Sequence, residues 1–232
     1  KEEPVYRNKI NGSLGWSAVI DACVARQVGK KELESNPHAQ AARDKEWDNL
    51  RGKDTWDESS VNEWYIVARN AREAGKLVHF GRLFGFCVEK GSELPDSEIG
   101  KRRKMKYRVV FQGNNVVDQS YEVALFQDLG SSPASVEASK YVDFYGTQEG
   151  YVQEQADADQ AYIQALLKGP ETWVALPREA WPDSWFYEDG TPIYNKPVVK
   201  LKRALYGHPD SGTFWERHCD GALKLSLIHI SE

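Results

Sequence analysis

Asp157 and Tyr162 are the residues whose types and spacing first indicate chemistry. Residues 151–156, which precede them, are partly β-branched and roughly alternating, a pattern that predicts a strand. Residues 162–167 then place apolar side chains at helical spacing, and a glycine and a proline at positions 169 and 170 end this predicted helix. A carboxylate at such a junction can project into a cleft. The structural alternative for a single acid here is a helix cap.

Positive charge gathers upstream of this aspartate. Six of the eight residues from Lys101 to Arg108 are Lys or Arg, whereas residues 114–196 carry fourteen acids against four bases. Local charge of this kind indicates where a polyanion can bind, even though the net charge of the chain is −5. The structural alternative is a solvated, charged edge that protects a strand from aggregation.

The secondary-structure pattern places these residues on specific elements. Residues 76–89 and 107–111 are strand-like runs, and the long loop between them contains Pro95, so the pair predicts a hairpin. Ser60 and Glu63 have the spacing of a capping box and predict the start of a helix that ends near Gly75. Further helices are predicted at residues 38–50, 133–146 and 213–224, and further strands at residues 172–177 and 197–202.

Composition limits the class of protein. A chain of 232 residues with eight tryptophans and eleven tyrosines is typical of a globular protein with a substantial core. No run approaches the apolar length of a membrane span, and no basic and apolar leader opens the chain. Cys23, Cys87 and Cys219 form no zinc motif, which favours buried thiols in a reducing compartment.

Three segments, in order, resemble the reverse transcriptases of copia-type LTR retrotransposons. Asp157 and Tyr162 resemble the first catalytic motif, in which a strand delivers an aspartate and an aromatic residue follows five positions later. Residues 107–113 are similar to the family's Lys-Ala-Arg-Leu-Val-Ala-Lys-Gly, and residues 199–207 to its Lys-Leu-Lys-Lys-Ala-Leu-Tyr-Gly. Three ordered matches over residues 100–218 are more specific than any one of them.

The resemblance implies an α+β fold made of the fingers and part of the palm of a reverse transcriptase, with an antiparallel sheet and packed helices. Residues 1–35 would be a weakly patterned upstream segment of a polyprotein. Residues 36–146 would hold the N-terminal helices and the fingers, and residues 147–224 the partial palm. Residues 225–232 resemble the translation of a sequencing-adapter end, and we expect no function from them.

The activity that the resemblance implies is RNA-directed DNA polymerisation, a nucleotidyl transfer that uses two Mg²⁺ or Mn²⁺ ions. Magnesium prefers hard oxygen ligands, which Asp157 and the carbonyl group of Ala158 would supply. Tyr162 would lie under the sugar of the nucleotide, where its bulk excludes a 2′-hydroxyl group.

The resemblance also implies how phosphate is bound. Arg108, with Lys106 beside it, matches the arginine that contacts the incoming triphosphate. A guanidinium group suits this role because it forms paired, charge-assisted hydrogen bonds to phosphate oxygens. The contacts to template and primer would come from Lys101, Arg102, Arg103, Lys104, Tyr206 and Gly207.

Two features depart from the family. After Gly207 the family has a Lys-x-x-Pro element, whereas residues 208–212 read His-Pro-Asp-Ser-Gly and lack the lysine and the final proline. The second source of carboxylates, an aromatic-x-Asp-Asp hairpin, has no counterpart because no Asp-Asp pair occurs in the sequence. With one metal-binding element missing, we expect this chain to be inactive as a polymerase on its own.

Two other classes of function stay open. One is a non-catalytic relic that binds nucleic acid, which the altered residues after Gly207 favour. The other is an unrelated metal-dependent hydrolase that uses Asp157 and Asp159, which would share a face if the strand continued through both. The partners implied by the resemblance are an RNA or DNA template-primer, a deoxynucleoside triphosphate and the rest of a Pol polyprotein with its integrase and RNase H, without a membrane. The implied location is intracellular, in cytoplasmic virus-like particles and in the nucleus.

Overall fold

A seven-stranded mixed sheet forms the framework of the chain, and two helices, given below as α2 and α3, pack on it. The computed structural model describes residues 25–126, 134–151 and 157–228. The strands are β1 (Ala25–Val28), β2 (Trp56–Glu63), β3 (Val78–Lys90), β4 (Lys104–Phe111), β5 (Val117–Asp118), β6 (Glu171–Ala175) and β7 (Pro197–Leu201). The helices are α1 (Lys30–Ser35), α2 (Pro37–Gly52), α3 (Trp64–Glu73), α4 (Val136–Gly146), α5 (Ala161–Gln164) and α6 (Ser211–Ile228). Within these described ranges, no helix has the length and apolar character needed to cross a membrane.

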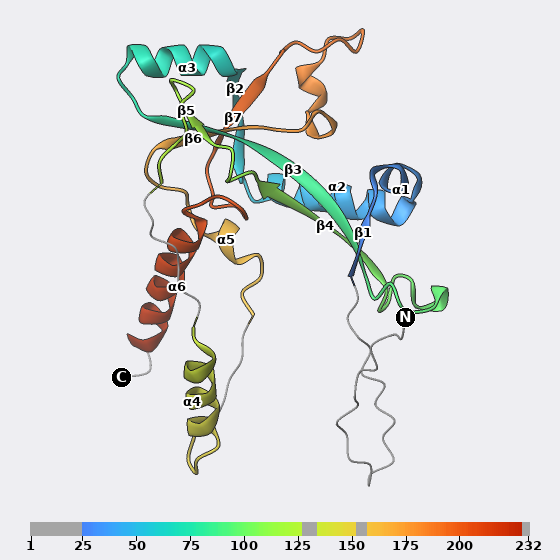
Figure 1. Ribbon diagram of the computed structural model, residues 1–232, viewed down its shortest axis with the longest axis vertical. Coiled ribbons are helices and arrows are strands. Elements are labelled where there is room, and N and C mark those ends of the chain that lie inside the picture. The colour runs from blue at the N-terminus through green and yellow to red at the C-terminus, as the bar shows by residue number, and fades with distance from the viewer. Residues whose placement is uncertain (1–24, 127–133, 152–156, 229–232) are drawn as a thin grey trace, which may run out of the picture.

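β3 is the long strand along which the sheet is assembled (Figure 1). Residues 78–82 pair in parallel with β6, and residues 83–90 pair in an antiparallel manner with β4. β1 and β5 add short antiparallel pairs, and the sheet continues from β6 to β7 and then to β2. One strand therefore joins the hairpin to the rest of the sheet.

The predicted hairpin is confirmed, since β3 and β4 are antiparallel and a long loop joins them. The prediction of an antiparallel sheet is wrong as stated, because β3 and β6 are parallel. A parallel pair requires a long crossover, and the chain from β3 to β6 passes through β4, β5, α4 and α5. Alternation of side chains within a strand carries no information about the direction of its partner.

The segment after Thr55 differs from the predicted capping box. Ser60 and Glu63 lie in β2, and helix α3 begins only at Trp64. The Ser60 hydroxyl donates to the carbonyl oxygen of Asp57 and accepts from the backbone N–H of Lys200. The Glu63 carboxylate accepts the backbone N–H groups of residues 195 and 196. The two side chains that were predicted to cap a helix therefore form hydrogen bonds to β7 and to the residues just before it.

Of the strand predicted at residues 151–156, only Tyr151 belongs to the described residues, and residues 152–156 lie outside them. Tyr151 and Asp157 themselves have no regular secondary structure. Both edges of β7 are occupied, one by β6 and the other by β2, so a strand before Asp157 could not pair directly with β7. The helix after Asp157 is a single turn, Ala161–Gln164, and is shorter than predicted, whereas α2, β6, β7 and α6 match their predicted positions closely.

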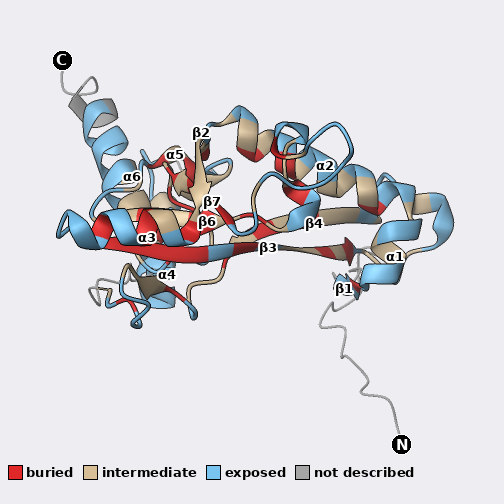
Figure 2. Cartoon of the chain, turned by 90° about the horizontal axis from the view of Figure 1, so that it is seen from above, coloured by how far each residue is buried: buried red, intermediate tan, exposed pale blue. Residues whose placement is uncertain are grey.

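Buried residues lie along much of β3 and on the elements beside it (Figure 2). Their side chains fall into two groups. In one, α2 packs Trp47 and Leu50 toward the hairpin, and Trp47 meets Trp56 edge to face with 5.9 Å between ring centroids. In the other, α3 stacks Trp64 on Phe80 of β3 with 4.8 Å between centroids. These aromatic contacts fix a helix on each part of the sheet.

The outer edge of β4 is held by the turn that follows β7. The backbone N–H of Phe111 donates to the carbonyl oxygen of Tyr206 at 2.7 Å. A Cβ atom on Gly207 would overlap the carbonyl oxygen of Phe111, and one on Gly113 would overlap that of Gly207. Gly207 also has a φ angle of +86°, which L residues rarely adopt. Two glycines therefore permit this close backbone contact.

We expect Gly207→Ala to lower the free energy of unfolding by about 3 kcal/mol, because it adds a steric overlap to an unfavourable φ angle. Gly190→Ala is the matched control, since its φ is +80° but an added Cβ would meet nothing within 4 Å. The control should cost only about 1 kcal/mol. Urea unfolding followed by circular dichroism measures both values, and equal losses would show that the contact with Phe111 is unimportant.

Candidate functional site

One cavity, of about 280 Å³, brings together residues from distant parts of the sequence. Its lining comes from α2, β4, the segment before α5, α5 itself and the turn after β7. Five of the predicted site residues line it, namely Lys106, Arg108, Asp157, Ala158 and Tyr206. Three carboxylates, those of Glu46, Asp157 and Asp159, thus meet two cations in one concave space.

β4 presents the two cations by strand alternation. Tyr107, Val109 and Phe111 are buried, whereas Lys106 and Arg108 occupy the intervening, less buried positions. The Arg108 Nη1 atom lies 3.7 Å from the Glu46 Oε1 atom on α2. Arg108 therefore reaches over the edge of the hairpin toward α2 and into the cavity.

Glu46 is a cavity residue that the sequence patterns did not single out. Its side chain is 15 % exposed, and burial raises the pKa of its carboxyl group, against the opposing effects of Arg108, the Val109 backbone N–H and Lys106. The available signal was its place next to Trp47 in a helix whose buried stripe includes Ala39 and Leu50. Its role as a counter-ion depends on the packing of α2 on β4.

The two cations of β4 raise the electrostatic potential of the cavity. Arg108 is the main cause of a lowered pKa for Lys106, with burial and Lys90 adding to it, while Glu46 and Asp157 act in the opposite direction. Two like charges in one partly enclosed space are favourable for an anion that can bind both. Lys106 and Arg108 are donors that can bind a phosphate group, and the carboxylates of Glu46, Asp157 and Asp159 line the same cavity and oppose them.

The Asp157 segment is held in place by the strand that leads into the Tyr206 turn. The Arg203 Nη1 group donates to the carbonyl oxygens of Ile163 and Gln164, at 3.3 Å each. The backbone N–H of Ala204 donates to Ala165 at 2.9 Å. Because Ile163 and Ala165 are buried, these bonds anchor α5 while Asp157 stays exposed at the cavity.

Asp159 lines the same cavity and takes a different environment. Its carboxylate lies 4.0 Å from the Lys53 Nζ atom and its side chain is 92 % exposed. Its carbonyl oxygen accepts the Gln164 side-chain amide at 2.7 Å. Gln160, with a φ of +51°, forms the tight turn between Asp159 and α5. Asp157 and Asp159 therefore belong to a turn and do not project from one strand.

Tyr162 and Tyr206 form a pair, with ring centroids 4.7 Å apart at an angle of 71°. Tyr206 lines the cavity, and burial raises the pKa of its hydroxyl group, as Asp157 also does. Tyr162 is not among the cavity residues and supports Tyr206 from one side. The contact of Tyr162 with a nucleotide sugar stays a prediction. Gly207 does not line the cavity either, and it contacts the backbone of Phe111.

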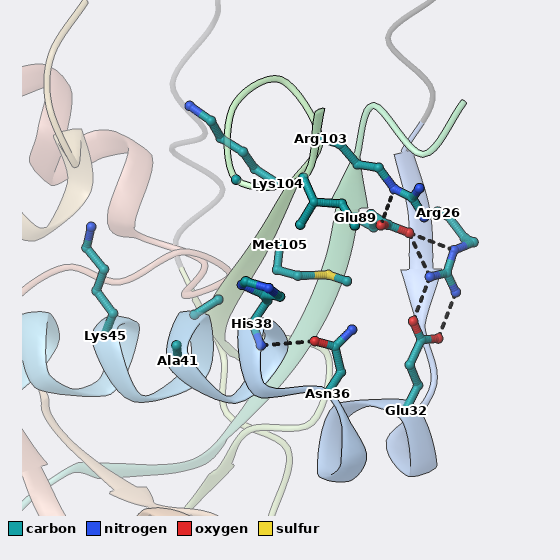
Figure 3. A pocket seen from close by; sticks show the side chains of 13 residues that line it. Arg26, Glu32, Asn36, His38, Ala41, Lys45, Glu89, Arg103, Lys104 and Met105 are labelled. Carbon is teal, nitrogen blue, oxygen red and sulfur yellow. Dashed lines mark hydrogen bonds and ion pairs between the residues drawn. The ribbon is translucent and has the colours of Figure 1, made fainter. Parts of the chain in front are cut away.

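The four cations predicted to contact template and primer, Lys101, Arg102, Arg103 and Lys104, lie at the tip of the hairpin and outside this cavity. Arg103 is turned inward, with its Nε atom 2.6 Å from Glu89 and its Nη1 atom 2.7 Å from Asp96. Arg26 of β1 binds the same Glu89 carboxylate at 2.7 Å and also binds Glu32 (Figure 3). Lys104 lines a second cavity of about 360 Å³ beside this network, and Lys101 and Arg102 are exposed.

Glu89 is the centre of this ion network. Its side chain is 3 % exposed, and burial by itself would raise its pKa. Hydrogen bonds from Arg103 and Arg26 outweigh that effect and bring the pKa below its ordinary value. Arg103 thus stabilises the carboxylate and ties the hairpin loop to β3. Nucleic-acid binding by the tip residues stays a prediction.

The described residues do not supply a complete set of ligands for metal ions. Asp157 and the Ala158 carbonyl oxygen are the hard donors that the sequence predicted. Across the described ranges, no three His, Cys, Asp or Glu side chains converge in a way that could hold an ion. These residues alone do not make up a two-metal site.

Comparisons with protein-family models, with curated proteins and with solved structures gave no match. Functional inference therefore depends on the chemistry of the cavity and on the sequence motifs.

We expect Arg103→Gln to lower the free energy of unfolding by about 2 kcal/mol, because it leaves the buried Glu89 with one guanidinium partner in place of two. Lys101→Gln, an exposed position in the same loop, should leave stability unchanged within about 0.5 kcal/mol. Chemical unfolding of both variants tests this. Equal stability of the two variants would contradict the structural role of Arg103.

Proposed function

We propose that this chain is part of an RNA-directed DNA polymerase similar to the copia-type reverse transcriptases, and that the cavity binds the triphosphate of an incoming nucleotide. The observation that supports the proposal most is the meeting of Lys106 and Arg108 from β4 with Asp157 in one cavity. Arg108 and Asp157 lie in two of the three segments that resemble the family, and Lys106 immediately precedes one of them. Folding thus groups the side chains that nucleotide binding requires.

Arg108 has the central role in the proposed binding step. Its guanidinium group can form paired, charge-assisted hydrogen bonds to phosphate oxygens, and Lys106 adds a second positive charge beside it. Glu46 holds Arg108 near the cavity at 3.7 Å, a distance at which Arg108 keeps donors for a ligand. Tyr206, supported by Tyr162, would form the wall against which the nucleotide lies.

Two Mg²⁺ or Mn²⁺ ions would supply the chemistry that activates a primer hydroxyl group and stabilises the leaving oxygen. Because Asp157 and Ala158 do not complete a site for them, we assign to the described residues the binding and positioning of the triphosphate and no bond-making step. A further carboxylate source is required for catalysis.

A non-catalytic nucleic-acid-binding relic is the second candidate, and His208 favours it. At the position after Gly207, where the family has a lysine, the chain has an imidazole that is 5 % exposed. The ring packs against Phe111 with 4.9 Å between centroids, and its Nδ1 atom accepts the Asp210 backbone N–H at 3.2 Å. Burial lowers the pKa of His208 to about 4, so the ring is neutral and supplies no charge to a template. The geometry at Asp159 gives no comparable support to a hydrolase.

The binding step can be tested on this chain without metal ions. Calorimetric titration with inorganic triphosphate should give binding that Arg108→Gln weakens about tenfold, the effect of one lost charge-assisted contact. Arg69→Gln is the control, because Arg69 is an exposed cation on α3 paired with Glu73. Equal affinity of the two variants would contradict the assignment of the cavity.

Catalysis can be tested on a protein extended with a downstream Asp-Asp hairpin. Primer extension should be lost in Asp157→Asn and retained in Asp159→Asn, because only the first carboxylate is assigned to a metal ion. Tyr162→Val should retain extension and incorporate ribonucleotides. An extended protein that binds template-primer and triphosphate but never extends would favour the relic.

A further inference from the structure

A separate cavity of about 380 Å³ lies where α6 begins, away from the Asp157 cavity. The start of β3, the segment after β5, the segment before β6 and the first turns of α6 converge on it. Its apolar walls come from Leu77, Leu125, Phe126, Pro170 and Phe214. Three parts of the chain far apart in sequence thus meet against α6.

A neighbouring cavity of about 430 Å³ shares Lys168, Phe214 and Arg217 with the first and adds Leu166 and Arg203. The two cavities lie next to each other along the first half of α6 and are here together called the α6 groove. Several of its apolar side chains are open to solvent, with Leu77 48 %, Leu125 88 % and Leu166 58 % exposed. Apolar side chains gathered beside a groove are typical of a ligand site.

The charge of the α6 groove is mainly positive. Lys168, Arg203 and Arg217 line it, and Asp210 is its one acidic lining residue among those described. None of the three cations forms an ion pair with a described acidic side chain. Burial raises the pKa of Asp210, against the opposing effect of His79. Among the described residues, the groove therefore places three cations without an acidic partner next to apolar walls.

His79 gives the floor of the groove a polar group that can bind a ligand. Its side chain is 4 % exposed, and its ring meets Phe126 with 4.8 Å between centroids. No hydrogen bond joins the ring to another described residue. Burial lowers the pKa of His79, so the neutral ring can donate from one nitrogen and accept at the other.

We infer that the α6 groove binds an anion joined to a planar apolar ring, such as an aromatic carboxylate, sulfonate or phosphate monoester. The ring would pack between Phe126 and Phe214, and the anionic group would bind Lys168 and Arg217, which both cavities share. In a mostly apolar cavity of this size, a few polar groups normally fix the orientation of a small ligand. This site is independent of the proposed nucleotide cavity.

The test uses 8-anilinonaphthalene-1-sulfonate, a fluorescent ring sulfonate, and N-phenyl-1-naphthylamine, which lacks the sulfonate group. The sulfonate should bind the chain at least about tenfold more tightly than the neutral dye. A double variant, Lys168→Gln with Arg217→Gln, should weaken the sulfonate about tenfold or more and leave the neutral dye unaffected. Lys140→Gln on α4, next to the exposed Tyr141, is the control for other apolar surfaces.

Competition identifies the anionic group. Both 1-naphthoate and 1-naphthyl phosphate should displace the sulfonate dye, and their relative affinities separate a carboxylate ligand from a phosphate ester. Inorganic phosphate that displaces the dye equally well would overturn the requirement for a ring. Equal affinity of the two dyes, or a double variant that binds like Lys140→Gln while keeping its circular dichroism spectrum, would overturn the site.

Discussion

The contact between the edge of β4 and the turn after β7 is the constraint on which the rest of the site depends. The Phe111 backbone N–H bonds to the Tyr206 carbonyl oxygen, and Gly113 and Gly207 allow the two backbones to approach. This single contact sets the distance between the hairpin and the segment that anchors α5. The contact thereby helps to place Arg108 and Asp157 at the same cavity.

Long-range charge compensation determines which cations are available for a ligand. At the tip of the hairpin, the buried Glu89 takes two guanidinium groups, so Arg103 stabilises the fold. Near the centre of the hairpin, Glu46 approaches Arg108 at 3.7 Å and leaves it at the cavity. Residues of the same type in one basic segment therefore have different roles, because a buried carboxylate must be paired and a cavity cation need not be.

β3 is the strand that joins the hairpin to the rest of the sheet. Its two parts pair with different partners, so the hairpin and the remainder of the sheet share one continuous backbone. Helix α3 packs on the first part of β3 through Trp64 and Phe80, and helix α2 packs against the hairpin and also contacts Trp56 of β2 through Trp47. The α6 groove begins at the end of the sheet where β3 and β6 start and shares no lining residue with the nucleotide cavity, although Arg203 lines the groove and also anchors α5. The fold can thus present two separate surfaces with different ligand chemistry.

The sequence by itself determined the hairpin, α2, β6 and β7, because periodicity is a local property. The resemblance to family motifs selected Asp157 and Arg108, whose roles stay predictions. Tertiary structure alone decided the parallel pairing of β3 with β6, the placement of Ser60 in a strand, the role of Glu46 and the burial of His208. Each of these depends on contacts between residues far apart in the chain. Local pattern does not encode such contacts, since the free energy that selects them comes from burial and pairing in the folded state.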